Sequence, residues 1–207
     1  MIKAKMILFD KLPASLLCPN NQYIISRVNR IKNDDYRSVS TLAYSLLSQM
    51  LSEISGLDIS NITIKENEHG KPDIVSNENI HFNLSHTNGA VCCVLSDSPI
   101  GIDVERIGNI RSLISDKCFT PSEAMLIKSP SDFYALWTLK ESYFKALGTG
   151  INKPLKNIEF TLATPIECRD SGVPVLFKFY STIIESYALS ITSEDVFSPS
   201  DLIISHI

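Results

Sequence analysis

Three apolar strand patterns in close succession, at residues 80–85, 90–96 and 100–106, constrain the fold of this 207-residue chain more than any other feature. Asn88-Gly89 joins the first two patterns, and this dipeptide favours the two-residue turn of a β-hairpin. Ser98-Pro99 separates the second from the third. Because a two-residue turn joins antiparallel neighbours, we expect an antiparallel sheet in the middle of the chain.

Two long helices are expected, one before these strands in the sequence and one after them. Apolar side chains recur at helical spacing between residues 34 and 54, and Gly56 is placed to end that helix. Thr120-Pro121-Ser122-Glu123 has the pattern of a helix start with a capping box. The second long helix is expected over residues 132–147, where Gly148 stops it.

Shorter strands are expected at residues 6–9 and 62–65, and three more between residues 158 and 191. Each half of the chain then contains a helix with antiparallel strands, which is an α+β pattern. We expect the division to fall between residues 1–98 and residues 99–207. The strand over residues 100–106 would lie beside the junction, where binding sites often form.

Composition excludes several classes of function. A net charge of −4 argues against broad nucleic-acid binding, which needs a basic surface. Five cysteines without a C-x-x-C pair predict reduced thiols, with Cys92 and Cys93 as small buried side chains. No apolar run approaches the roughly 18 residues that span a bilayer, and Asp10 interrupts the N-terminal apolar stretch. We therefore expect a cytoplasmic protein that does not enter the membrane.

Asp103 and Glu105 form a carboxylate pair on one strand, in the sequence Gly101-Ile102-Asp103-Val104-Glu105. Side chains two apart lie on the same face of a strand, so two like charges come close together. A lone pair of this kind is more often the solvated face of an edge strand. A cation against the pair would also relieve the repulsion, and carboxylates with water suit Mg²⁺ or Mn²⁺.

The second long helix carries Lys140, Glu141 and Lys145 among many apolar side chains. Glu141 and Lys145 are four residues apart and could form a surface ion pair contributing about 0.3–0.5 kcal/mol. The polar stripe on this helix is narrow, so the same pair could instead face a cleft. Lys140 lies about 100° around the helix from Glu141 and could reach another part of a ligand.

Ser85 and His86 end an alternating strand next to the glycine turn. Such a histidine is more often structural, but it could donate a hydrogen bond to a phosphate. Lys71, in Gly70-Lys71-Pro72, would by itself indicate a solvated turn. A basic cluster precedes the first long helix and is most often a solvated face. Its members are Arg27, Arg30 and Arg37.

These segments together resemble the 4′-phosphopantetheinyl transferases of the surfactin-synthetase-activating (Sfp-like) type. The family pattern is G-K-P, then F-N-x-S-H, then G-[IV]-D-[IV]-E, then W-x-x-K-E-[SA]-x-x-K. The chain contains all four in order, at residues 70–72, 82–86, 101–105 and 137–145. Residues 119–123 also resemble the family's F-[ST]-x-x-E segment.

The resemblance implies a fold of two similar α+β halves related by a pseudo-twofold, with coenzyme A bound in the seam. Asp103, Glu105 and Glu141 match the residues that coordinate Mg²⁺, with Mn²⁺ as a possible substitute. The family's contacts to coenzyme A fall on Lys71, Ser85, His86, Lys140, Lys145 and Arg37. Among these, His86 corresponds to a position near the 3′-phosphate.

The implied reaction is attack by a carrier-protein serine on the phosphate that bears pantetheine. Holo-carrier protein and adenosine 3′,5′-bisphosphate are the products, and Glu141, Lys145 and Asp103 are the implied catalytic residues. The partner would be an apo carrier protein of nonribosomal peptide, polyketide or fatty-acid synthesis, and the enzyme a monomer. A non-catalytic coenzyme A-binding relative and a Mg²⁺-dependent phosphohydrolase stay open as alternatives.

Overall fold

The computed structural model of the protein describes residues 1–13, 15–77, 79–110 and 117–207. Its helices are α1 (Gln22–Asn29), α2 (Asp34–Ser55), α4 (Pro121–Leu126) and α5 (Pro130–Leu147). The strands of the first half are β1 (Ile2–Leu8), β2 (Ile64–Glu66), β3 (Pro72–Ile74), β4 (His81–Thr87) and β5 (Ala90–Ser96). Those that follow are β6 (Ile100–Arg106), β7 (Ile158–Thr161), β8 (Glu167–Asp170), β9 (Val173–Pro174), β10 (Lys178–Ile184), β11 (Tyr187–Ser193) and β12 (Leu202–His206).

The two long helices begin and end at the residues that the sequence predicts, to within two positions. The Asn33 side chain caps α2 by accepting a hydrogen bond from the amide of Tyr36, and Gly56 ends it with φ +66°. Ser129 and Asp132 form a capping box at the start of α5, and Gly148 ends that helix. The predicted capping box of α4 is also confirmed.

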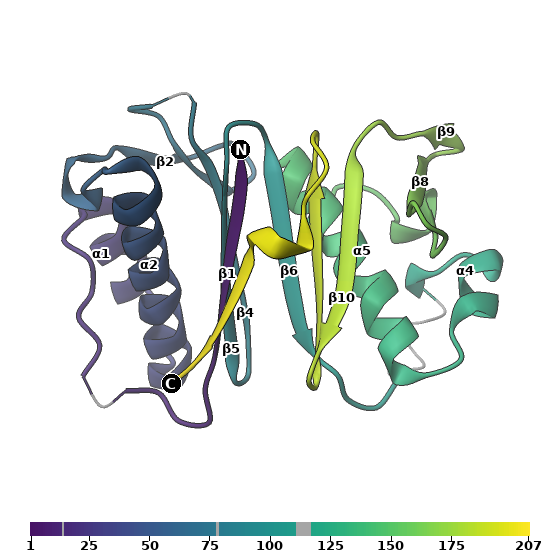
Figure 1. Ribbon diagram of the computed structural model, residues 1–207, viewed down its shortest axis with the longest axis horizontal. Helices are drawn as coiled ribbons and strands as arrows, with labels where there is room; N and C mark the ends of the chain where they lie inside the picture. Colours follow the sequence, from purple (N-terminus) through teal and green to yellow (C-terminus); the bar gives the residue numbers. More distant parts are fainter. Residues whose placement is uncertain (14, 78, 111–116) are drawn as a thin grey trace.

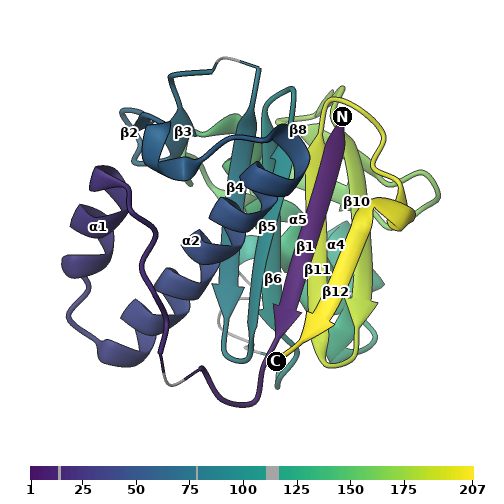
Figure 2. The same ribbon diagram turned by 60° about the vertical axis from the view of Figure 1, so that its left-hand side comes forward.

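The first sheet is built on the predicted hairpin. Strands β4 and β5 pair antiparallel on either side of Asn88-Gly89, where Gly89 has φ +84°. Strand β5 also pairs antiparallel with β1, and β12 adds parallel to β1, giving the order β12-β1-β5-β4. Figure 2 shows β12 lying beside β1, so the last strand of the chain returns to the first sheet.

The second sheet has the order β10-β11-β6. Strand β6 pairs antiparallel with β11, with Asp103 opposite Ser190, and β11 pairs antiparallel with β10. The remaining edge of β6 therefore carries no backbone ladder. This edge lies toward β4, where side chains take over the hydrogen bonding.

The two halves share one topology. In each half a first strand (β1 or β6) comes before the long helix (α2 or α5), and a hairpin follows (β4–β5 or β10–β11). The second strand of each hairpin lies between its hairpin partner and the first strand of that half, with which it pairs antiparallel: β5 lies between β4 and β1, and β11 lies between β10 and β6. This repeated order fits the pseudo-twofold relation, and the predicted α+β class with two similar halves is confirmed.

Three hydrophobic clusters hold these layers together. The first joins α1 and α2 to the first sheet through side chains such as Leu46 and Val91. The second lies between the two sheets and includes Met6 and Ile102. The third joins α5 to the second sheet. Figure 1 shows the result, with α1 and α2 on one side of the strands and α4 and α5 on the other.

The prediction of three strands between residues 158 and 191 is wrong, because five strands, β7 to β11, lie over residues 158–193. Strands β7, β8 and β9 form a small separate sheet. Strand β8 has four residues and β9 has two, which is too short for an alternating pattern to stand out. Helix α1 and strand β12 were not predicted.

Two expectations from composition can be compared with the structure. Cys92 and Cys93 are fully buried in β5, as predicted. Within the described residues, we find no helix with the length and apolar character needed to cross a bilayer.

Candidate active site

Helix α5 approaches strand β6 closely because residue 101 is glycine. A Cβ built on Gly101 would lie 2.0 Å from the carbonyl oxygen of Ser142 and 2.5 Å from the amide nitrogen of Ala146. Side chains alternate between the faces of a strand, so Asp103 and Glu105 share the face of Gly101 and project toward α5. The glycine thus brings the helix against the two carboxylates.

Asp103 is the buried centre of the cluster, with 4% of its surface exposed. Its Oδ1 accepts hydrogen bonds from Ser85 Oγ at 2.9 Å and from Lys145 Nζ at 2.7 Å. Among the described residues, Asp103 Oδ2 is the one buried side-chain polar atom without a hydrogen-bond partner. An unpaired buried carboxylate oxygen is costly, so this atom indicates a ligand that completes the site.

Lys145 extends from α5 to strands β4 and β6 and is partly buried between them. Its ammonium donates to Asp103, to Ser85 Oγ at 3.0 Å and to the carbonyl of Ile102 at 3.2 Å. It forms its ion pair with Asp103 across the two elements, so it is not the surface partner of Glu141 that the helical spacing allowed. The alternative of a plain surface salt bridge is therefore wrong.

Glu141 lies near enough to Asp103 and Glu105 for their charges to act on its carboxyl group. Burial raises its pKa to about 7, the negative charges of Asp103 and Glu105 add to the rise, and Lys145 opposes it. Glu105 accepts a hydrogen bond from Thr87 Oγ1 at 3.3 Å. The charges of Asp103 and Glu105 thus oppose the ionisation of Glu141, and a bound cation would relieve that repulsion.

Two side chains of β4 replace a backbone ladder between β4 and β6. Asn83 Oδ1 accepts a hydrogen bond from the amide of Ile102 at 2.9 Å, and Ser85 Oγ accepts one from the amide of Val104 at 3.2 Å. Sequence reasoning identified Ser85 but missed Asn83. The signal was present, because both residues are the polar positions of one alternating strand.

His86 lies at the end of β4 against the first turn of α2. Its ring makes an edge-to-face contact with Tyr36, with 5.1 Å between the ring centroids. Burial lowers the pKa of His86, and the nearby charge of Lys145 lowers it further. Arg37 follows Tyr36 on α2, where its guanidinium donates to the carbonyl of Ile31 and pairs with Asp34.

Lys71 reaches the same region from the turn before β3. Its ammonium donates to the carbonyl oxygen of Ile100 at 3.1 Å, and burial lowers its pKa. A cavity of about 250 Å³ is lined by Lys71 together with Asn83, Glu141 and Lys145. The structure therefore brings residues of both halves of the chain to one cavity.

Lys140 does not belong to this group, contrary to the expectation that it contacts a phosphate. It is fully buried, and its ammonium pairs with Glu123 at 2.7 Å. The same ammonium also donates to the carbonyl oxygens of Cys118, Leu155 and Ile158. Burial lowers the pKa of Lys140, while the charge of Glu123 opposes that shift. With four oxygen partners in the interior, the ammonium is not available to a ligand.

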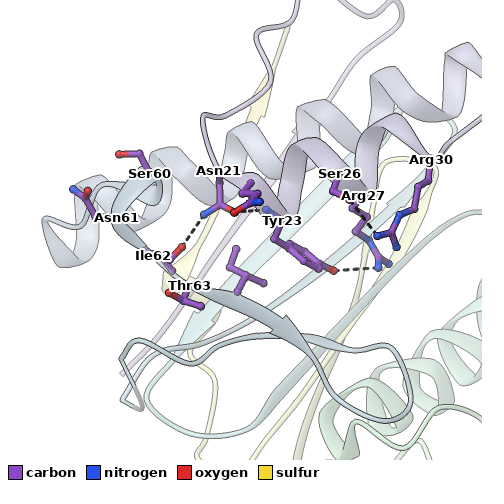
Figure 3. Close-up of a pocket in the computed structure, with 11 residues that line it drawn as sticks. Asn21, Tyr23, Ser26, Arg27, Arg30, Ser60, Asn61, Ile62 and Thr63 are labelled. Atoms are coloured by element: carbon purple, nitrogen blue, oxygen red, sulfur yellow. Dashed lines mark hydrogen bonds between the residues drawn. The ribbon is translucent and has the colours of Figure 1, made fainter.

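A second polar cavity, of about 520 Å³, lies between α1 and the segment around residues 60–64. Figure 3 shows Tyr23 and Arg27 joined by a hydrogen bond in its wall, with Arg30 beside them. Arg27 also pairs with Glu66. Of the described residues, none lines both this cavity and the one beside Lys145.

The donor set of the cluster fits a hard divalent cation. Carboxylate oxygens are the ligands that Mg²⁺ prefers, and Asp103 Oδ2 is an unpaired one. As the side chains stand, the described residues contain no group of three or more histidine, cysteine, aspartate or glutamate side chains gathered for metal binding.

Comparison with known proteins gives a consistent assignment. The model of the 4′-phosphopantetheinyl transferase superfamily matches residues 99–192. The 4′-phosphopantetheinyl transferase gsp of Aneurinibacillus migulanus is 35% identical over 155 residues, which cover 72% of this chain and 63% of gsp. The 4′-phosphopantetheinyl transferase Sfp of Bacillus subtilis is 32% identical over 181 residues, which cover 83% of this chain and 80% of Sfp.

The matched part of the chain thus spans less than two thirds of the length of gsp. It spans four fifths of the length of Sfp. Among solved structures, the holo-[acyl-carrier-protein] synthase of Helicobacter pylori in complex with coenzyme A aligns with 45% of this chain and 97% of its own. The TM-score is 0.40 and the identity 20%, which is too distant to support an argument. On its relatives, the chain belongs to the 4′-phosphopantetheinyl transferase superfamily, which confirms the family that its motifs resemble.

Proposed function

We propose that this protein transfers the 4′-phosphopantetheine group from coenzyme A to a serine of an apo carrier protein. The observation that carries this proposal is the state of Asp103. It is a buried carboxylate with one oxygen held by Ser85 and Lys145 and the other without a partner among the described residues. Such an atom, next to Glu141 and Glu105, supports a site for a divalent cation and a phosphate.

Asp103, Glu105 and Glu141 are the proposed ligands of Mg²⁺, with Mn²⁺ able to replace it. A bound Mg²⁺ would polarise the phosphate and neutralise charge that develops on its oxygens. Like-charge repulsion among the three carboxyl groups favours cation binding, because the raised pKa of Glu141 returns toward its ordinary range when positive charge arrives.

Coenzyme A is the proposed donor, held by basic side chains from both halves. Lys71 and Lys145 line one cavity and carry ammonium groups that suit a pyrophosphate. His86 contacts Tyr36, the residue before Arg37 on α2, and we assign His86 and Arg37 to a further phosphate of coenzyme A at this end of β4. Ser85 Oγ already donates its proton to Asp103, so we assign it to the support of that carboxylate.

In the proposed reaction the carrier serine loses its proton as its oxygen forms a bond to the β-phosphorus of coenzyme A. The bond from that phosphorus to the bridging oxygen breaks, and adenosine 3′,5′-bisphosphate leaves with the electron pair. Glu141 is the proposed acceptor of the serine proton, either directly or through a water molecule. Lys145 would stabilise charge on the leaving oxygen.

The acceptor class is proposed at the level of the family: an acyl or peptidyl carrier domain of fatty-acid, polyketide or nonribosomal peptide synthesis. A cytoplasmic, monomeric enzyme fits the reduced cysteines and the surface of mixed charge. A Mg²⁺-dependent phosphohydrolase could use the same carboxylates, and a non-catalytic relative could use the same phosphate contacts. The three functions differ in whether a carrier protein receives the phosphopantetheine group, water receives it, or no reaction occurs.

The test follows release of adenosine 3′,5′-bisphosphate by chromatography, with coenzyme A and Mg²⁺, in the presence of an apo carrier protein. A matched carrier in which the acceptor serine is replaced by alanine is the control. Transferase activity predicts release with the intact carrier alone. Equal release with both carriers indicates a hydrolase, and no release with a broad panel of intact carriers indicates a non-catalytic relative.

A further inference from the structure

We propose that Asn83 is a positioning residue for Asp103, acting across the seam between the two halves of the fold. This inference rests on the proposed function. Asn83 is not itself a candidate ligand of the metal, and its amide oxygen is committed to the backbone of β6. Its effect on transfer would therefore pass through the position of that strand.

The contact is buried and adjoins the carboxylate in sequence. Asn83 is 7% exposed, and its Oδ1 lies 2.9 Å from the amide nitrogen of Ile102, the residue before Asp103. The carbonyl of Ile102 accepts a hydrogen bond from Lys145 Nζ at 3.2 Å. Ile102 is thus bound to β4 through its amide and to α5 through its carbonyl oxygen. Asp103 is the next residue of the same strand.

No backbone ladder fixes β6 against β4, because the two strands belong to different sheets. Side chains must therefore set their relative position along the seam. Ser85 bonds the amide of Val104, but it also contacts Asp103 and Lys145, so replacing it changes the site directly. Among the described residues, the side chain of Asn83 bonds the backbone of β6 and makes no hydrogen bond to Asp103 or Lys145. Because Asn83 also lines the cavity beside Lys71, the KM for coenzyme A is followed separately from kcat.

Position along this seam matters because the proposed site uses both halves. Strand β4 carries His86, while β6 and α5 carry the carboxylates and Lys145. A displacement of β6 would move Asp103 relative to a phosphate held from the first half. Misplacement by about 1 Å can slow a reaction by about 100-fold while ground-state binding changes less.

The experiment compares Asn83→Leu, which has a similar size but no acceptor, with Asn83→Asp, which keeps an acceptor oxygen. Asn21→Leu is the matched control, because Asn21 is also buried and bonds backbone carbonyls, at Ile59 and Ile62, away from the seam. For each protein we would measure melting temperature, Mn²⁺ affinity by calorimetry without coenzyme A, and kcat and KM for transfer.

We expect Asn83→Leu to lower kcat by about 10- to 100-fold with little change in the KM for coenzyme A. Its Mn²⁺ affinity should fall by about 10-fold, the scale known for residues that orient metal ligands. Asn83→Asp should recover part of both losses, and Asn21→Leu should lose melting temperature alone. If Asn83→Leu fails to fold, Asn83→Ser, which is too short to reach Ile102, takes its place in the same comparison.

Wild-type kcat and Mn²⁺ affinity in Asn83→Leu, with only the melting temperature lowered, would overturn the positioning role and leave the proposed function standing. Equal losses in Asn83→Leu and Asn21→Leu would overturn it as well, because they would indicate general destabilisation. A wild-type protein that neither binds Mn²⁺ nor modifies any carrier would instead overturn the proposed function.

Discussion

At the scale of single residues, the site depends on a carboxylate that the fold buries without fully pairing. Asp103 Oδ1 is held by a hydroxyl and an ammonium, while Oδ2 has no hydrogen-bond partner among the described residues. Burying a charge in this way destabilises the folded chain unless a ligand completes it. Removal of this charge is therefore expected to lower activity far more than it changes stability.

Replacing Asp103 by asparagine should reduce transfer by more than about 100-fold, the scale seen when a single electrostatic contact to a transition state is lost. The melting temperature without metal should change little, because the relief of repulsion toward Glu141 offsets the loss of the ion pair with Lys145, and an amide still accepts from Ser85. Single-turnover transfer at saturating coenzyme A measures the first effect. Asp97→Asn, at an exposed pair with the N-terminus, is the control. Wild-type transfer in Asp103→Asn would exclude this carboxylate from the site.

His86 should make the stability of the free protein depend on pH. Burial lowers its folded-state pKa below the unfolded value of about 6.5, so the unfolded chain binds protons more readily as the pH falls through that value. Relative to His86→Gln, the wild type should lose stability between about pH 7.5 and pH 5.5. Glu141, whose raised pKa acts in the opposite direction, is present in both proteins and cancels in this comparison. Urea unfolding at both pH values measures the difference. Parallel pH profiles for the two proteins would contradict this account of the burial of His86.

At the scale of elements, the close approach of α5 to β6 determines whether Glu141 and Lys145 lie near Asp103 and Glu105 on β6. Gly101 permits that approach, since any Cβ there would collide with the backbone of Ser142 and Ala146. The sequence motif shows that a glycine is present, but the reason for it lies in a helix forty residues further along the chain. Only the tertiary structure supplies that reason.

Gly101→Ala should cost about 2–3 kcal/mol of unfolding free energy, because a methyl group must force helix and strand apart. Transfer should slow in the same variant, since the helix carries Glu141 and Lys145. Gly108→Ala is the matched control, because the one described atom that its Cβ would meet within 4 Å is Tyr134 Oη, at 3.5 Å. Chemical denaturation and single-turnover kinetics test both effects. Equal stability of the two variants would mean that the close approach has no energetic consequence.

Lys140 ties α5 to α4, and its removal should leave Glu123 as an uncompensated buried charge. Lys140→Met should therefore cost about 3–5 kcal/mol, and a second substitution, Glu123→Gln, should recover much of that loss. The KM of the double variant for coenzyme A should stay at the wild-type value. A strongly raised KM in a double variant that has regained its stability would restore Lys140 as a phosphate contact.

Local sequence patterns predicted the helices and strands that carry the site. They failed to predict strands that are very short or that form by pairing with a distant part of the chain. The helix ending at Gly56 and the hairpin at Asn88-Gly89 have strong local signals, and both were predicted. Strand β12 forms by pairing with β1 at the opposite end of the chain, which no local pattern reveals. Helical spacing correctly predicted that Lys140 points in a different direction from Glu141. It could not predict the burial of Lys140, because the groups that bind its ammonium come from distant segments of the chain.

At the scale of the whole molecule, one topology used twice places its two open strand edges against each other. Strands β4 and β6 meet there, and the cavity between the halves takes residues from both. We propose a division into residues 1–98 and 99–207, between the end of β5 and the start of β6. Strand β12 crosses back to β1 and ties the second half to the first.

The central claim is that this seam moves phosphopantetheine onto a carrier serine, and the intact mass of an apo carrier protein tests it most directly. After incubation with the protein, coenzyme A and Mg²⁺, the carrier should gain the mass of one phosphopantetheine group. The gain should be absent with EDTA, with Glu141→Gln, or with a carrier lacking the serine. An unmodified mass across acyl and peptidyl carriers, with coenzyme A intact or merely hydrolysed, would contradict the account.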